Sequence, residues 1–546
     1  MARYRHTRFP FVRPRELEGG RRRVPVLIVG AGPVGLALAI DLALHGIASV
    51  LVDDGDTVSV GSRAICWSKR TLEIFDRLGV AGRMVAKGVT WKVGRLFHGD
   101  REVYNFDLLP EPGHKHPAFV NLQQYYVEEY LIDRAHAFPE LIDLRFKSRL
   151  VALEKSPGCM EAVIETPEGR YSLDCDWLVA CDGVRSTVRG LLGLDFIGQT
   201  FEERFLITDI EMQADFPPER RFWFDPPFHD GQSALLHKQP DDIWRIDLQL
   251  GPDADPEKEK RLENVVPRIR AIVGERPFEI DWVSVYTFQC RRLERFVHGR
   301  VIFAGDSAHI VSPFGARGGN GGIQDVDNLA WKLAAVLDGR APDRLIESYD
   351  EERIRGADEN LLNSARSTTF MTPKSEMERI LREEVLALAR TEPFARRLVN
   401  SGRLSVPCSL AGLSHLTPDE SVFGEAGLPP GSACADAPVR RVSGGQSGWL
   451  LDEMKGEMLV LALGRPAAVP RGVPQLVVVP EGAIAPAPDG HTYVVDCQSM
   501  VAARYGWHEG AAYLIRPDQH VAARFLRPSE TAIAAALDRA LGRAPA

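Results

Sequence analysis

The chain has 546 residues, 45% of them hydrophobic, which is enough for several packed cores at about 150 residues per domain. A charged fraction of 26% is typical of globular proteins and excludes a disordered chain, a fibre or a coiled coil. The 66 Lys and Arg residues against 75 Asp and Glu residues give a net charge of −9, so no nucleic-acid partner is expected.

Residues 1–23 form a basic arm with eight arginines and two acids, and we expect this arm to lie on the body of the protein. The alternative is a basic tether for a membrane or a partner. No apolar segment of the kind found in signal peptides follows it, which predicts that the protein is not exported. The longest apolar runs, such as residues 24–30, are far shorter than the roughly 20 residues that cross a membrane, so no membrane segment is expected. The eight cysteines include no C-x-x-C pair, which predicts reduced thiols and a cytoplasmic location.

Residues 24–53 have the pattern of a strand, a glycine-rich turn, a helix and a second strand. The turn GAGPVG contains Gly30, Gly32 and Gly35, where glycines allow a tight turn and the close approach of a pyrophosphate. Asp53 ends the second strand, where a carboxylate accepts hydrogen bonds from a nucleotide ribose. The pattern predicts a dinucleotide site. Its spacing does not separate FAD from NAD, because both present the same pyrophosphate to the helix N-terminus.

Helices are predicted within 62–78 and 121–138, alternating strands between 195 and 285, and a mostly helical stretch over 343–403. The predicted units are the arm at 1–23, a discontinuous nucleotide-binding domain with a helical extension at 24–194 and 286–403, a sheet-rich domain at 195–285, a linker at 404–438 and an α/β unit at 439–546.

Two further segments carry a family resemblance, CDGVRSTVRGLLG at 181–193 and RVIFAGDSAHIVSPFGARGGNGGIQDVDNLAWKL at 300–333. Together with GAGPVG they resemble the three signatures of class A FAD-dependent aromatic hydroxylases of the para-hydroxybenzoate hydroxylase fold. The chain is most similar to the branch of 3-(3-hydroxyphenyl)propionate hydroxylase and phenol hydroxylase. The resemblance implies an α/β fold, with a Rossmann-like FAD-binding domain, an inserted sheet-rich substrate domain and a C-terminal thioredoxin-like domain. Because that last unit has no C-x-x-C pair, we expect it to be structural or dimerising.

The resemblance also implies which residues bind FAD. Asp306, next to Gly305, would hydrogen-bond the ribityl chain, while Gly318 and Asn320 would approach the flavin pyrimidine edge as a helix starts near Gly322. The other residues that match FAD-contacting or NAD(P)H-handling positions are Arg63, Gln124, Asp182, Arg185 and Pro313.

Three positions depart from the family pattern. Ala316 and Arg317 stand in a loop that commonly reads PxGGQGxN, so substrate preference or flavin mobility is expected to differ. Asp53 stands where glutamate is usual, which keeps the carboxylate and shortens its reach.

The resemblance implies that NADPH or NADH binds transiently as a co-substrate and reduces FAD. Dioxygen would then form a flavin carbon-4a hydroperoxide that hydroxylates a phenolic or related aromatic compound. The sheet-rich domain should supply a polar group near the phenol oxygen. Its candidates are His237, Gln239, Arg245 and Tyr286, each of which also fits a strand residue that faces solvent or core. His309 is interpreted as a packed histidine. No metal site is expected, because the His114 and His116 pair has no further ligand at a suitable spacing.

The expected partners are a small aromatic substrate, dioxygen and a second copy of the chain in a homodimer. Three alternatives stay open. The first is a reductase or halogenase of the same fold, although the halogenase signature W-x-W-x-I-P is absent. The second is a non-enzymatic flavoprotein, and the third is an NAD dehydrogenase. The sequence does not decide between NADH and NADPH, nor does it name the aromatic substrate.

Overall fold

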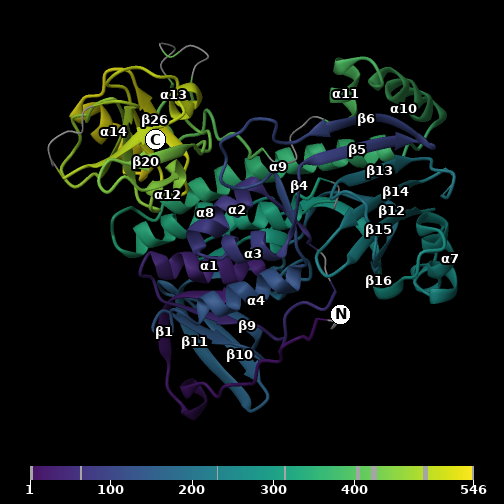
Figure 1. Ribbon diagram of the computed structural model, residues 1–546. Helices are drawn as coiled ribbons and strands as arrows, with labels where there is room; N and C mark the ends of the chain where they lie inside the picture. Colours follow the sequence, from purple (N-terminus) through teal and green to yellow (C-terminus); the bar gives the residue numbers. More distant parts are fainter. Residues whose placement is uncertain are drawn as a thin grey trace.

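The computed structural model describes residues 4–61, 64–229, 231–251, 253–312, 315–400, 406–419, 423, 427–483 and 490–543, without the side chains of 201–203 and 288. Figure 1 shows three regions around the long helices: a C-terminal unit in yellow, a sheet-rich region beside it, and a lower region that contains β1 and β11. The predicted α/β fold class is confirmed, whereas the likeness of the C-terminal unit to thioredoxin stays a prediction.

The first sheet holds the predicted nucleotide-binding unit, and its central strands are parallel. Its strands are β17 (Val297–His298), β18 (Val301–Phe303), β11 (Gly169–Ala180), β1 (Arg22–Val29), β2 (Ser49–Val52) and β8 (Ile142–Arg145), with β9 (Arg149–Ser156) and β10 (Cys159–Thr166) attached to β11. Val26, Leu27 and Ile28 are buried in succession, as expected for a strand covered on both faces. The helices α1 (Pro33–Leu44), α4 (Gln124–Ala135) and α8 (Gly318–Leu337) pack together beside it.

The second sheet is mostly antiparallel and has two different faces. Its strands are β19 (His309–Ile310), β16 (Glu279–Arg292), β12 (Ile197–Glu211), β15 (Ile243–Leu250), β14 (Ser233–Lys238), β13 (Arg220–Phe224), β5 (Val93–His98) and β6 (Arg101–Asp107). One face packs apolar residues such as Trp244 and Ile246 together with Val265 and Ile269 of α7 (Leu262–Val273). The β5–β6 hairpin was not predicted. It is far from β12–β16 in the sequence and joins them only through the parallel pairing of β5 with β13.

The remaining elements connect these sheets. A small sheet contains β3 (Cys66–Ser68), β7 (Phe119–Asn121) and β4 (Val89–Trp91). The other helices that precede the C-terminal unit are α2 (Lys69–Leu78), α3 (Ala81–Lys87), α5 (Thr187–Leu191), α6 (Pro256–Glu259), α9 (Leu345–Met371), α10 (Glu376–Ala389) and α11 (Pro393–Val399). In Figure 1, α9 runs from the C-terminal unit to the sheet-rich region, where α10 and α11 lie above β5 and β6.

The C-terminal unit is a seven-stranded mixed sheet with short helices. Its strands are β21 (Ser447–Trp449), β20 (Pro438–Arg441), β24 (Thr492–Asp496), β23 (Gln475–Pro480), β22 (Leu459–Leu463), β25 (Ala512–Ile515) and β26 (Val521–Phe525), and its helices are α12 (Leu450–Glu453), α13 (Met500–Tyr505) and α14 (Glu530–Ala540).

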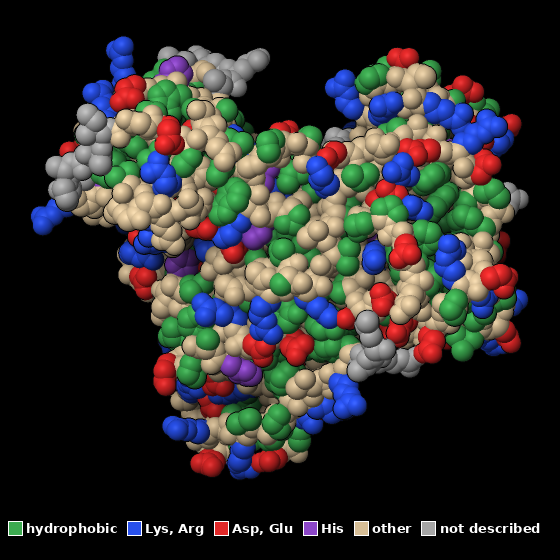
Figure 2. Space-filling model, in the orientation of Figure 1, with side chains coloured by type: hydrophobic (Ala, Val, Ile, Leu, Met, Phe, Trp, Pro, Cys, Tyr) green, Lys and Arg blue, Asp and Glu red, His purple; other side chains and the backbone are tan. Residues whose placement is uncertain are grey.

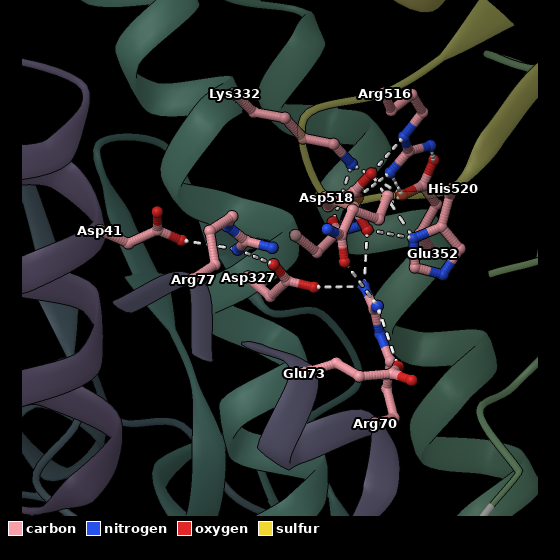
Figure 3. Close-up of polar contacts among 12 residues, drawn as sticks. Asp41, Arg70, Glu73, Arg77, Asp327, Lys332, Glu352, Arg516, Asp518 and His520 are labelled. Atoms are coloured by element: carbon pink, nitrogen blue, oxygen red, sulfur yellow. Dashed lines mark hydrogen bonds and ion pairs between the residues drawn. The ribbon is translucent and has the colours of Figure 1, made fainter. Parts of the chain in front are cut away.

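A buried polar cluster attaches the C-terminal unit to α2, α8 and α9 (Figure 3). Arg516 donates to both carboxylate oxygens of Glu352 on α9, at 2.6 and 2.8 Å, and also pairs with Asp518. Lys332 on α8 donates to Glu352 at 2.8 Å, and Arg70 on α2 donates to the Asp518 carbonyl at 2.7 Å. The turn between β25 and β26 is therefore held against the helices that pack on the first sheet.

The N-terminal arm contacts the body. Tyr4 stacks on Tyr125 with ring centroids 4.1 Å apart, and Phe9 stacks on Phe146 at 4.4 Å. Figure 2 shows Lys and Arg interspersed with Asp and Glu over the visible face. In the part of the chain that the structure describes, no helix has both the length and the apolar character needed to cross a membrane. All eight cysteines are free thiols.

Candidate active site

The glycine-rich loop after β1 leaves room for a nucleotide at the start of α1. Gly30 has φ +106°, and a Cβ there would lie 2.5 Å from the Cys181 carbonyl oxygen, so another residue does not fit. Gly32 is the N-cap of α1, and a Cβ built on it meets nothing within 4 Å. The helix N-terminus therefore faces open space, which suits a pyrophosphate.

Asp53 follows β2 and is bonded to this loop. Its Oδ2 accepts a hydrogen bond of 2.6 Å from the Ala31 amide, and its Oδ1 accepts one of 2.8 Å from the Gly55 amide. Burial raises the pKa of Asp53, although these amides act in the opposite sense. Asp53 thus shapes the glycine loop directly. Its predicted contact with the ribose stays a prediction.

The loop after β18 is held by a buried carboxylate. Asp325 on α8 accepts hydrogen bonds from the Gly305 amide at 2.9 Å, His309 Nε2 at 2.7 Å and Arg353 Nε at 2.7 Å. Burial alone would raise the pKa of Asp325, but His309 and Arg353 hold it well below its usual range. His309 is packed, in agreement with its interpretation from the sequence. The neighbouring Asp306 is exposed and lines the pocket described below.

Helix α8 begins at Gly318, four residues before the predicted start near Gly322. Asn320 ties this first turn to β3, because its Oδ1 accepts from the Ser68 amide at 2.9 Å and its Nδ2 donates to the Cys66 carbonyl at 2.8 Å. These bonds offset the low helix propensity of the glycines. A Cβ at Gly322 would lie 3.1 Å from Gly305 Cα, so the helix approaches the loop closely there.

The remaining predicted FAD contacts fall into three groups. Gln124 lines the pocket and its Oε1 accepts from the Ala64 amide at 3.1 Å, whereas its neighbour Gln123 donates to the Pro240 carbonyl. Asp182 follows β11 and accepts from the Val188 amide at 3.1 Å, while Arg185 is exposed. Arg63 and Pro313 lie outside the described residues.

Arg189, which the sequence did not single out, joins two of these loops. Its guanidinium donates to the Val184 carbonyl at 2.6 Å and to the Ser307 carbonyl at 3.3 Å. It therefore positions the loop after β11 against the loop after β18. The sequence signal was its place in the CDGVRSTVRG motif, but only the fold shows which carbonyls it reaches.

One cavity joins the nucleotide loops to the second sheet. It encloses about 1910 Å³ including its open mouth. From the nucleotide side it is lined by Gly32, Gln124, Gly183, Asp306, Gly318 and Asn320, and from the second sheet by Phe205, Arg220, Leu235, His237, Arg245, Asp247 and Tyr286. The structure thus brings His237, Arg245 and Tyr286 to the same cavity as the predicted cofactor residues.

The sheet wall of this cavity carries buried charge. Arg245 on β15 donates from Nε and Nη2 to the two carboxylate oxygens of Asp209 on β12, both at 2.8 Å. Burial, with Arg220 and Arg245 nearby, holds the pKa of His237 well below its ordinary value, so the ring is neutral. Burial also raises the pKa of Asp247 to about 6.

Two polar atoms of this wall have no hydrogen bond: His237 Nδ1 and Asp247 Oδ1 are buried and unbonded among the described residues. Buried polar atoms are nearly always bonded, so an orphan in a cavity indicates a place for a polar ligand. Gln239, in contrast, does not line the cavity and donates to Asp209 at 3.1 Å. Sequence reasoning missed Asp247. The available signal was the alternation of Arg245 and Asp247 with Trp244, Ile246 and Leu248, which places the polar pair on one face.

The comparisons identify the family. Residues 23–364 match the family model described as the FAD binding domain, and the chain belongs to this family. The chain is 31% identical over 423 residues to a 12-dehydrotetracycline 5-monooxygenase/anhydrotetracycline 6-monooxygenase of Streptomyces rimosus, covering 74% of this chain and 82% of the relative. It is 29% identical over 429 residues to a 3-(3-hydroxy-phenyl)propionate/3-hydroxycinnamic acid hydroxylase of Burkholderia cenocepacia, covering 77% of each. These matches confirm the predicted resemblance and the prediction of a flavin-dependent monooxygenase enzyme.

A solved structure shows the same fold along nearly the whole chain. The flavin-dependent monooxygenase PieE, crystallised in complex with FAD and substrate, superposes with a TM-score of 0.78. At 23% identity, the match covers 96% of this chain and 99% of PieE.

Proposed function

We propose that this enzyme is an FAD-dependent, NAD(P)H-consuming monooxygenase that hydroxylates a phenolic or related aromatic compound. The observation that carries the proposal is the single cavity in which the nucleotide loops meet the buried polar wall of the second sheet. The relatives named as a 3-(3-hydroxy-phenyl)propionate/3-hydroxycinnamic acid hydroxylase and as a 12-dehydrotetracycline 5-monooxygenase/anhydrotetracycline 6-monooxygenase support the aromatic class of substrate.

The residues present fit FAD. Gly32 leaves open space at the N-terminus of α1, Asp306 and Asn320 line the cavity, and Asp182 Oδ1 is buried without a hydrogen bond among the described residues. When bound, FAD would supply the redox chemistry, accepting hydride from NAD(P)H and activating dioxygen. In the overall reaction one oxygen atom forms the new carbon–oxygen bond, the other leaves as water, and the nicotinamide is oxidised.

Asp247 is the residue we assign to the phenol proton. Its pKa is raised to about 6 and its Oδ1 is unbonded, so near neutral pH a carboxylate faces the cavity and accepts a hydrogen bond from the substrate hydroxyl. Withdrawing that proton increases the electron density of the ring. The neutral His237, with Nδ1 unbonded, is a second polar contact, while Arg245 is held by Asp209 and orients the wall.

Apolar side chains form another part of the cavity wall. They include Ile65, Trp67, Phe205, Ile207 and Leu235, all in the lining. Such a lining excludes water from the reacting atoms, which reduces unproductive oxidation of the nicotinamide.

The test is aerobic oxidation of NADH and of NADPH by the purified flavoprotein with a panel of phenols and phenolic acids, and mass spectrometry of the products. We expect one group of compounds to accelerate oxidation and to gain one oxygen atom. If no compound accelerates NAD(P)H oxidation, or if compounds accelerate it and none gains oxygen, the reductase or non-enzymatic alternatives would be favoured. The two nucleotides, run in parallel, decide the coenzyme.

We also propose a cytoplasmic homodimer, as the family resemblance implies. Apolar side chains on α10 and α11, among them Met377, Leu381, Phe394 and Leu398, are exposed by 55% or more and offer a surface for a second copy. Light scattering of the wild type and of Leu381→Glu tests this. A dimer that Leu381→Glu leaves intact would place the interface elsewhere, such as on the C-terminal unit.

A further inference from the structure

A second chamber adjoins the candidate active site on the same face of the second sheet. It encloses about 630 Å³ including its open mouth, and it lies between the edge of the sheet and the C-terminal end of α9, close to α11. Its apolar lining comes from β5 and β6 (Leu96, Phe106), β13 (Phe222, Phe224) and α9 (Phe370, Met371). Figure 1 shows these strands beside the end of α9, beneath α10 and α11.

Arg220 lines both this chamber and the active-site cavity. It is the first residue of β13, on the same face as Phe222 and Phe224 because side chains alternate along a strand. Its position makes it the junction between a cavity with buried polar groups and a chamber lined by aromatic rings.

The guanidinium of Arg220 has no hydrogen bond or ion pair with any described residue. The neighbouring arginines do have such partners: Arg95 and Arg221 both donate to Glu219, at 3.0 and 2.8 Å, and Arg245 is paired with Asp209. Burial lowers the pKa of Arg220, and the nearby Asp247 offsets this only in part. A half-buried cation without a bonded partner is unfavourable in the free protein, and a ligand carboxylate would satisfy it with two parallel hydrogen bonds.

We propose that the substrate is an aromatic carboxylic acid with an apolar extension: its reactive ring occupies the active-site cavity, its carboxylate binds Arg220, and its extension fills the second chamber. This inference rests on the proposed function, because it assigns the reactive ring to the flavin side. A single-ring phenol would leave the aromatic chamber empty, and a neutral polycyclic compound would leave Arg220 unpaired. The chamber and the guanidinium together therefore select for size and charge.

The test compares three probes by calorimetry with the FAD-containing enzyme in the absence of nicotinamide. The probes are 5-phenylsalicylate, salicylate, which lacks the extension, and 4-hydroxybiphenyl, which lacks the carboxylate. We expect 5-phenylsalicylate to bind at least tenfold more tightly than either of the others. Equal affinities for all three would overturn the proposal.

Three variants separate the parts of the site. Arg220→Met should weaken both acids at least tenfold and leave 4-hydroxybiphenyl unchanged, while Arg220→Lys should restore part of the loss. Ser367→Phe on α9 reduces the chamber volume and should weaken the two phenyl compounds but not salicylate. Flavin content and melting temperature report on whether each variant folds.

These experiments test the proposed ligand class and the proposed reaction independently. If the expected order of affinities is found but no probe gains oxygen, the proposed hydroxylation is wrong and the proposed class of ligand is supported. If neutral phenols are hydroxylated and Arg220→Met binds the two acids as tightly as the wild type does, the proposed hydroxylase function is supported and the proposed carboxylate site at Arg220 is wrong.

Discussion

Arg245 and Asp209 are cross-strand partners on β15 and β12, and two hydrogen bonds of 2.8 Å join their side chains beneath the cavity floor. Both residues are at most 3% exposed. Each charge is acceptable in the interior only because the other is present, so this pair fixes the polar wall against which His237 and Asp247 lie.

Removing one member of this pair should be costly. Arg245→Met leaves the buried Asp209 carboxylate with Gln239 as its remaining side-chain donor among the described residues, and we expect the free energy of unfolding to fall by ~3–5 kcal/mol. The double variant Arg245→Met/Asp209→Asn should recover part of the loss, because neither charge of the pair remains. Urea unfolding of the flavin-containing protein measures both. The control is Arg170→Met, whose ion pair with Glu165 is 65% and 39% exposed and should contribute under ~1 kcal/mol. Similar losses for the two arginines would contradict the interpretation.

Gly32→Val should block the nucleotide site without unfolding the chain. The space beyond Gly32 is open in the protein alone, so the new methyl groups clash with a bound pyrophosphate and not with the fold. We expect at least tenfold less flavin per purified chain, read from flavin absorbance after denaturation. Gly82→Val on α3 is the matched control, because a Cβ there also meets nothing within 4 Å. Normal flavin content in Gly32→Val would show that the dinucleotide lies elsewhere.

Asp247 should make stability depend on pH. Its pKa is about 6 in the folded protein against 3.8 as the ordinary value, so the folded state binds the proton more tightly. The cost of ionising it is absent below pH 3.8, grows up to about pH 6 and is complete above that. Asp247→Asn removes this cost. Its free energy of unfolding relative to the wild type should therefore rise by up to ~3 kcal/mol between pH 4 and pH 7, measured by urea unfolding. A constant difference across this range would show that Asp247 has an ordinary pKa.

The same residue should affect the reaction. With Asp247 as proton acceptor, kcat/KM for a phenol should rise through an apparent pKa near 6 in the wild type, and Asp247→Asn should lose that limb and lower kcat by a factor of about 10²–10⁴. A pH profile of substrate-dependent NAD(P)H oxidation checks this. An unchanged profile in the variant would assign the phenol proton to another group.

The polar cluster in Figure 3 should govern the attachment of the C-terminal unit. Glu352→Gln leaves Arg516 and Lys332 buried without their shared carboxylate, and we expect a loss of ~3–5 kcal/mol together with faster proteolysis between the units. Glu481→Gln is the control, because its pair with Arg440 is 58% and 38% exposed. Equal protease resistance of the two variants would show that apolar packing alone holds the unit.

The three sequence motifs meet in space for a simple reason. Gly30, Asp182 and Asp306 each follow a strand, and these strands, β1, β11 and β18, are parallel neighbours. The carboxyl ends of parallel strands lie at one edge of the sheet, so residues that are far apart in the chain are brought to the same edge. This part of the site, and the Gln124 position, followed from local patterns.

The sequence by itself determined the nucleotide-binding unit and most strands and helices, because glycine turns, apolar runs and period-2 alternation are local signals. The resemblance of its three motifs to known signatures indicated the family. Tertiary structure alone decided the substrate side. Asp209 meets Arg245 through the register of β12 with β15. Arg220 reaches its chamber because β5, which carries β6 on its other side, pairs with β13 across more than a hundred residues. Alternation along a strand shows which of its residues share a face, but it does not show which strand pairs with it. A buried charge is stable only where the neighbouring strand supplies its partner, so the tertiary structure decides where charges are buried.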